Sequence, residues 1–508
     1  MNYKRNPRTI VKNTIFLYIR MLFILVISLY TSRLVLKELG IVDYGIYNVV
    51  GGLITIFSFI NVSMTQASQR YITYEVGGGS TDSLRKTFST CVYIHLVIAG
   101  LIVILGETIG LWYIYNIAVI PPDRFNAALW VYQCSIIVSC ATIITVPYNA
   151  LIIAHEKMSA FTFLSILEAI LKLIIVLLLI ITPYDKLVVY GILMAFLSIF
   201  MRFVYGIYSY KTFPETSLIR HIDKNYIKTM GKFAGWSLCG CIAAAGYTQG
   251  LNLLINFFFN PTINAARGIA VTVQAVIRNF ANNFQLAVNP QIIKSYALND
   301  IAYLHLLIYR ASFFSFFLFF IVALPVFLEI NTLLSLWLID VPPYSNIFIR
   351  ILLVISSVEL LASPLNVSAQ ATGDIKRYEL TTSLILLLIV PLSYITLKLY
   401  PLPENVFLVF LLQTCIALIA RFLIIKRKIG LSFKLYFFNI IGRIILISLI
   451  STIIPIILHC YIANPILRLI CVVIGCLSFT PCAVFLLGLN DSEKLFFIKK
   501  IKHRFKNV

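Results

Sequence analysis

The chain is built from apolar runs that are each long enough to cross a lipid bilayer as a helix. Of its 508 residues, 60% are hydrophobic and only 12% are charged. About 20 apolar residues span the hydrocarbon core as an α-helix, which satisfies its own backbone hydrogen bonds there. The sequence therefore predicts an all-α integral membrane protein and excludes a soluble domain of this length.

We predict about fourteen transmembrane helices from these runs. Their approximate ranges are 13–37, 45–72, 86–113, 126–153, 159–182, 186–209, 233–258, 262–289, 302–328, 345–370, 379–399, 405–425, 436–459 and 464–488. An even number of spans places both termini on the same side of the membrane.

Lysine and arginine are distributed unevenly between the two sides. The N-terminus, the even-numbered connections and the C-terminal tail hold roughly 26 of the 41 Lys and Arg residues, and the opposite connections about four. Cytoplasmic connections are enriched in these residues, so we expect both termini to be cytoplasmic. Clusters such as Lys426-Arg427-Lys428 would then lie against the anionic inner leaflet of the phospholipid membrane. This placement explains the net charge of +21 without nucleic acid.

The longest polar interruption lies at about 211–232 and suggests a division of the chain. We expect five parts, namely an N-terminal six-helix lobe (1–210), a cytoplasmic linker (211–232), a C-terminal six-helix lobe (233–428), two additional helices (429–488) and a basic cytoplasmic tail (489–508). The connections are short and leave no room for a soluble catalytic domain.

Two motifs recur at similar offsets in the two predicted lobes. Pro147-Tyr148-Asn149 is matched by Pro364-Leu365-Asn366, 217 positions later, and each is followed at the same distance by alanine. Asp43-Tyr44-Gly45-Ile46 is matched by Ala266-Arg267-Gly268-Ile269, 223 positions later. Six helices per repeat give both lobes the same orientation, so a pseudo-two-fold axis along the membrane normal would relate them.

A polar stripe runs along the span that begins near 262. Its seven residues fall within an arc of roughly 80° on one helix face; they are Asn264, Arg267, Gln274, Arg278, Asn282, Gln285 and Asn289. An arginine at the bilayer centre costs roughly 2.5–3.5 kcal/mol. The stripe is therefore expected to face a water-filled cavity or the bundle interior.

Neighbouring spans carry similar stripes. The preceding span places Gln249, Asn252, Asn256 and Asn260 on one face, and the second span carries Thr55, Ser58, Asn61, Thr65 and Gln69. One interpretation is a hydrophilic cavity lined by amides and guanidinium groups. The alternative is interhelical hydrogen bonding, because Asn and Gln also join membrane helices.

The end of the first span resembles a known family. It reads Thr31-Ser32-Arg33-Leu34-Val35-Leu36-Lys37-Glu38-Leu39-Gly40, followed by Asp43-Tyr44-Gly45-Ile46-Tyr47. These residues resemble the opening signature of Wzx-type polysaccharide flippases, which belong to the multidrug/oligosaccharidyl-lipid/polysaccharide exporter superfamily. The helix count, the repeat and Gln370-Ala371-Thr372-Gly373-Asp374 fit the same family along most of the chain.

The resemblance implies a two-lobed, V-shaped bundle in a MATE-like arrangement. It also implies a flippase in the bacterial cytoplasmic (inner) membrane, which moves an undecaprenyl-pyrophosphate-linked oligosaccharide to the outer leaflet by alternating access. Such a protein would serve O-antigen, capsule or exopolysaccharide synthesis, possible partners being a polysaccharide polymerase and H⁺ or Na⁺ as a coupling ion. It would not be an enzyme.

Intramembrane polar residues are the candidate binding groups. Arginine presents forked donors that suit a pyrophosphate, and amides pair with sugar hydroxyls. The candidates are Arg278, Arg267, Arg20, Arg33, Gln274, Asn282, Asn252, Asn256 and Asn61. Arg20 could instead be a snorkelling anchor. Arg33 lies about 220° around the helix from Arg20, so both cannot line one narrow face.

Two intramembrane carboxylates stand out. Glu168 and Lys172 are four residues apart and are expected to neutralise each other. Glu359 has no basic neighbour at helical spacing, so it either binds a coupling ion or pairs with an arginine from another helix.

Other chemistries find no support in the sequence. The ten cysteines have no CxxC or zinc-ligand spacing, and His95, His155, His305 and His459 show no metal or triad spacing. We therefore expect no metal, cofactor or catalytic residue. Two alternative functions remain, an ion-coupled exporter of small amphiphiles and, from a different class, a membrane polysaccharide polymerase or ligase.

Overall fold

The computed structural model describes residues 7–55, 58–116, 120–219, 224–259, 261–338, 340–489 and residue 494. Asn260, the side chains of Thr55 and Ser58, and nearly all of the basic tail lie outside the described part.

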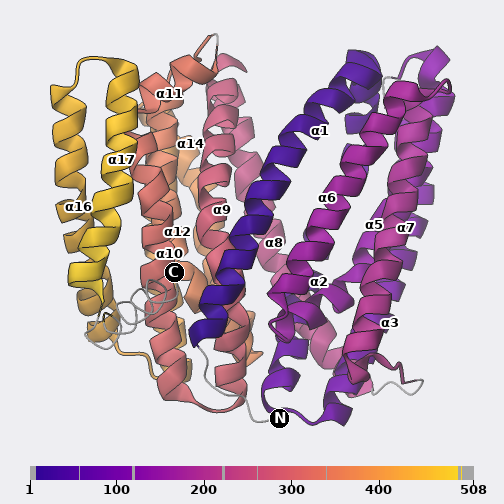
Figure 1. Cartoon of the computed structure of the whole chain (residues 1–508), viewed down its shortest axis with the longest axis horizontal. Helices are drawn as coiled ribbons and strands as arrows, with labels where there is room; N and C mark the ends of the chain where they lie inside the picture. The colour runs from indigo at the N-terminus through magenta and orange to yellow at the C-terminus, as the bar shows by residue number, and fades with distance from the viewer. Residues whose placement is uncertain are drawn as a thin grey trace, which may run out of the picture. The chain divides into compact units, whose positions relative to one another are not determined.

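The described residues form helices and no strand (Figure 1). The α-helices are α1 (Pro7–Thr55), α2 (Ser58–Gly78), α3 (Thr81–Leu105), α4 (Leu111–Asn116), α5 (Phe125–Ala154), α6 (Met158–Ile181), α7 (Lys186–Thr212), α8 (Lys224–Phe258), α9 (Pro261–Ala297), α10 (Ile301–Leu328), α11 (Ile330–Trp337), α12 (Ser345–Thr372), α13 (Lys376–Leu387), α14 (Ile389–Leu399), α15 (Asn405–Ile429), α16 (Gly442–Tyr461) and α17 (Pro465–Ala483). Short π- or 3₁₀-helical pieces are η1 (Gly106–Gly110), η2 (Pro122–Arg124), η3 (Pro214–Thr216), η4 (Leu435–Ile441) and η5 (Val484–Gly488).

Every predicted span has a helical counterpart. Twelve stretches of the described chain are long and apolar enough to cross a membrane. Of the two remaining predicted spans, 45–72 covers the second helix of α1 and most of α2, and 262–289 falls on α9. The expected all-α membrane architecture is thus confirmed, and about fourteen helices agree with it.

A glycine separates the first two spans. Gly40 has φ 77° and ψ 171°, so α1 is in fact two helices joined at this residue. The positive φ suits glycine because a Cβ atom would be strained there. The second helix of α1 therefore starts directly after the family-like Arg33–Gly40 segment and carries Asp43, Tyr44 and Tyr47.

Two compact units make up the chain. Unit 1 comprises Met1–Ile242, Leu286–Asp300 and Gln370–Glu379; unit 2 comprises Ala243–Gln285, Ile301–Ala369 and Leu380–Val508. Helices α8, α9, α12 and α13 therefore each contribute residues to both units. The predicted sequence repeat divides the chain differently and remains a prediction.

Each unit has its own apolar core. In unit 1, α5 packs against α3 and α7, around fully buried side chains such as Phe88 and Tyr132. In unit 2, the rings of Phe348 and Phe407 lie 4.4 Å apart in a second core. The C-terminal pair α16 and α17 forms a hairpin that packs on α10 (Figure 1). Large apolar side chains are also exposed on the outer helix faces, as expected for a surface against lipid.

Candidate functional site

The two arginines of the α9 stripe are bonded within unit 2. Arg267 is buried and donates hydrogen bonds to the Asn252 side chain and to the backbone carbonyl of Thr248, at 2.9 Å for the latter. Arg278 forms an ion pair with Glu359 of α12. The partner that Glu359 lacks on its own helix is thus supplied by α9, which is the structural alternative that the sequence left open.

Two glutamines of the same stripe also bind α12. Gln274 donates to the Ser356 hydroxyl at 2.6 Å, and Gln285 accepts from the Ser363 hydroxyl at 2.7 Å. Interhelical hydrogen bonding therefore accounts for part of the stripe. Asn256 and Asn282 are exposed, whereas Asn252 bonds both Arg267 and Gln249. In unit 1, the side-chain oxygen of Asn61 is buried and has no hydrogen-bond partner among the described residues.

A cavity of about 400 Å³ lies inside unit 1. Residues of α1, α6 and α7 line it; they are Arg20, Ile24, Ile27, Ser28, Thr31, Ser32, Val35, Tyr44, Tyr47, Ser165, Glu168, Ala169, Lys172 and Tyr190. Apolar and aromatic side chains together with a few hydroxyls and charged groups are typical of a small-molecule site. Arg33 is exposed and is absent from the lining, in keeping with its different helix face.

The charges of this cavity do not cancel. Lys172 donates to Glu168 at 2.7 Å, which confirms the expected local pair. Arg20 places its guanidinium 4.4 Å from the centre of the Phe161 ring, and its Nε is buried without a hydrogen-bond partner among the described residues. Arg20, Lys172 and Glu168 together therefore give the lining one net positive charge.

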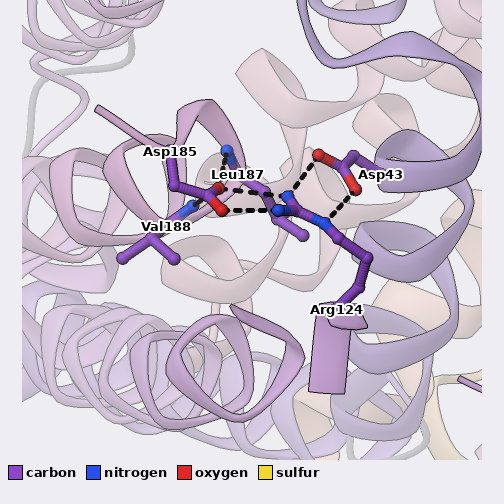
Figure 2. A network of polar contacts seen from close by, with 5 residues as sticks. All are labelled: Asp43, Arg124, Asp185, Leu187 and Val188. Carbon is purple, nitrogen blue, oxygen red and sulfur yellow. Dashed lines mark hydrogen bonds and ion pairs between the residues drawn. The ribbon is translucent and has the colours of Figure 1, made fainter. Parts of the chain in front are cut away.

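A charged network joins α1, η2 and the start of α7 (Figure 2). The Arg124 guanidinium bridges Asp43 and Asp185, with Nη2 2.5 Å from Asp43 Oδ2 and Nη1 2.5 Å from Asp185 Oδ2. Asp185 also accepts from the backbone N–H groups of Leu187 and Val188 and so caps the start of α7.

Three tyrosines of the cavity lining lie close in sequence to the residues of this network. Tyr44 and Tyr47 follow Asp43 in the second helix of α1, and Tyr190 lies in the second turn of α7, with the rings of Tyr47 and Tyr190 5.0 Å apart. Hydrogen bonding by Arg124 lowers the pKa of Asp185 from its ordinary value, so this carboxylate stays charged.

The sequence reasoning missed Arg124, Asp185 and Tyr190. A signal for Arg124 was present, because basic residues are scarce on the predicted outer side and this one precedes a span. Asp185 likewise stands directly before the apolar run of α7, where an N-cap residue is expected. Tyr190 gave no signal, since a tyrosine in an apolar run is ordinary.

Comparisons place the fold among known structures. The sequence matches no family model and no curated protein. The outward-facing conformation of a multidrug resistance MATE family transporter of the MOP superfamily is similar, with a TM-score of 0.73 at 12% identity, over 83% of this chain and 95% of that chain.

Two further solved structures are also similar to this chain. A variant of the Vibrio cholerae MATE transporter VcmN has a TM-score of 0.71 at 16% identity, over 85% of this chain and 98% of the other. A MATE structure in the bent conformation has a TM-score of 0.71 at 12% identity, over 83% and 95% of the two chains. At such identities the likeness establishes the architecture, and the chain has the fold of MATE family transporters.

Proposed function

We propose that this protein is a membrane transporter that flips a lipid-linked, pyrophosphate-bearing oligosaccharide across the bacterial cytoplasmic membrane by alternating access. The fold is that of MATE transporters, which supports transport as the general activity. Both termini lie in the cytoplasm on this proposal, as the Lys and Arg asymmetry predicts.

The observation that carries the choice of substrate is the charge of the unit 1 cavity. An unpaired carboxylate would favour cationic amphiphiles, and an unpaired cation favours anions. Here the lining carboxylate, Glu168, already binds Lys172, and Arg20 is a further cation of the lining. A pyrophosphate would pair with the Arg20 guanidinium, and the tyrosine and serine hydroxyls of the lining suit sugars.

The two α9 arginines could also contact the substrate, on the condition that they give up their present protein partners. Arg278 and Arg267 already have protein partners, so an anion can bind them only by exchange. Exchange at Arg278 would free Glu359, which could then take up a coupling ion. In unit 2, the exposed amides of Asn256 and Asn282 would be available to sugar hydroxyls, whereas Gln274 and Asn252 could bind a glycan only by exchanging their present hydrogen bonds.

Binding to the purified protein in nanodiscs tests the proposal. Undecaprenyl pyrophosphate is the anionic probe and a lipophilic cationic dye is the competing one. We expect Arg20→Ala to weaken undecaprenyl pyrophosphate binding by roughly ten- to hundredfold, as for loss of a hydrogen bond to a charged group. Arg20→Lys should restore part of the affinity, because it keeps the charge and loses the fork.

Arg33→Ala is the matched control, since Arg33 is an exposed arginine on the same helix. It should leave binding unchanged. Equal loss in both variants, or tighter binding of the dye than of the pyrophosphate lipid, would refute the anionic substrate and favour the small-amphiphile exporter.

A further inference from the structure

Two buried cations hold helix ends inside unit 1. Arg70 of α2 is only 8% exposed and donates from Nε and Nη2 to the backbone carbonyls of Gln370 and Ala371, each at 3.1 Å. Lys294 of α9 is 4% exposed and donates to Glu156 Oε1 at 2.7 Å. Gln291 donates to the other oxygen of Glu156 at 3.2 Å. The first contact involves the end of α12, and the second joins α9 to the residues that follow α5.

The sequence repeat relates these two contacts. Gly373 lies 217 positions after Glu156, the offset of the repeated Pro-x-Asn motifs, and both residues have positive φ angles, 77° and 57°. Lys294 lies 224 positions after Arg70, within one position of the offset of the other motif. Under the predicted repeat, each half thus places a cation from its polar-striped helix against a helix end of the other half.

The two contacts differ in the group that accepts the cation: backbone carbonyls at the end of α12, and a carboxylate after α5. A Cβ atom at Gly373 would lie 2.7 Å from Arg70 Nη2, so only glycine leaves room for the guanidinium to reach the last carbonyls of α12. These carbonyls carry the negative end of the helix dipole. At the equivalent position after α5, the Glu156 side chain accepts the cation instead.

Close backbone packing surrounds the second contact. A Cβ atom at Gly77 would lie 2.9 Å from Lys294 Cα, and one at Gly78 would lie 2.9 Å from the Ala297 carbonyl oxygen. The end of α2 therefore touches the end of α9 at backbone distance. All of these residues lie near the predicted cytoplasmic ends of their spans.

Helices α9 and α12 continue from these ends into unit 2, at Gln285 and Ala369. Polar contacts, which have defined made and broken states, hold the ends at this point. A buried ion pair adds little net stability compared with apolar packing, but breaking one partner is strongly unfavourable. Such contacts are suited to hold one conformation and to release as a unit.

We propose that these contacts are two latches on the cytoplasmic side of a transport cycle. The α12 latch is Arg70 with the carbonyls of Gln370 and Ala371, and the α9 latch is Lys294 with Glu156 and Gln291. Both are closed in this conformation, and their release frees the ends of α9 and α12 from the rest of unit 1. The inference rests on transport by alternating access, but not on the identity of the substrate.

Hydrogen exchange of the protein in nanodiscs, read by mass spectrometry, tests the α9 latch. Glu156→Gln should speed exchange of the amides at 291–299 about tenfold, because Lys294 loses its charge partner. The exchanged pair Glu156→Lys with Lys294→Glu should restore protection. Unchanged exchange in Glu156→Gln, or failure of the exchanged pair to restore protection while the thermal transition is retained, would overturn the latch.

A glycine pair tests the α12 latch. Gly373→Ala should speed exchange at 370–374, because the added methyl group displaces Arg70. Gly430→Ala is the matched control, since Gly430 also has a positive φ, 70°, at a helix end but has nothing within 4 Å of the added Cβ. Equal changes at both helix ends would show backbone strain alone and refute the α12 latch. Neither test uses the lipid substrate. A negative result in these exchange experiments would refute the latches, whereas a negative result in undecaprenyl pyrophosphate binding would refute the proposed substrate.

Discussion

The α9 stripe of unit 2 and the cavity of unit 1 both contain intramembrane arginines, yet these differ in their availability to a ligand. Arg278 is paired with Glu359, and Arg267 is bonded to Asn252 and a backbone carbonyl. Arg20 lines a cavity and keeps a buried donor without a partner among the described residues. The difference teaches that an arginine at mid-membrane depth is no more than a candidate, and that pairing with neighbouring helices decides whether it can bind an anion.

The largest expected effect comes from breaking the ion pair of unit 2. Arg278→Ala leaves Glu359, 15% exposed, without its partner, which should cost about 2–3 kcal/mol of stability after allowance for solvent near the 34% exposed Arg278. The double variant Arg278→Ala with Glu359→Ala should recover much of the loss. Thermal unfolding in detergent measures both. If Arg278→Ala is as stable as wild type but loses binding of undecaprenyl pyrophosphate, Arg278 is a ligand group and the contrast with Arg20 fails.

An intermediate effect is expected at the network of unit 1. Arg124→Ala should lower stability at neutral pH by about 1–2 kcal/mol, because Asp43 and Asp185 lose their shared partner at a partly exposed site. It should also loosen Tyr44, Tyr47 and Tyr190 and so weaken binding in the cavity. Lys186→Ala, which removes the neighbouring bond to Glu38, is the control and should have the smaller effect on binding.

The pH dependence of the same network has a definite sign. The pKa of Asp185 is lowered in the folded protein, so its pairing stabilises the fold above the ordinary aspartate pKa of about 3.9. This stabilisation is lost as the pH falls through the lowered folded value. Unfolding temperatures of wild type should therefore fall more steeply with acidification than those of Arg124→Ala. Parallel curves would show that the pair of Arg124 and Asp185 contributes nothing to stability as the pH falls.

The smallest effect is expected at exposed stripe residues. Asn282→Ala should change stability by less than about 0.5 kcal/mol, since Asn282 is exposed on α9. Gln285 lies three residues after Asn282, about one turn along the same face; Gln285→Ala removes the bond with Ser363 and should cost about 1 kcal/mol. Equal costs in thermal unfolding would contradict the division of the stripe into bonded and exposed residues.

The sequence by itself determined the membrane architecture and much of the candidate list. Hydrophobic runs, helical periodicity and the local pair of Glu168 and Lys172 depend on neighbours along the chain, so they could be read without coordinates. The tertiary structure alone decided that Glu359 meets Arg278, that Arg124 joins Asp43 to Asp185, and that Arg20, but not Arg33, faces a cavity. These contacts join residues about 60 to 150 positions apart, and helix periodicity defines which face a side chain occupies but not which neighbouring helix that face meets.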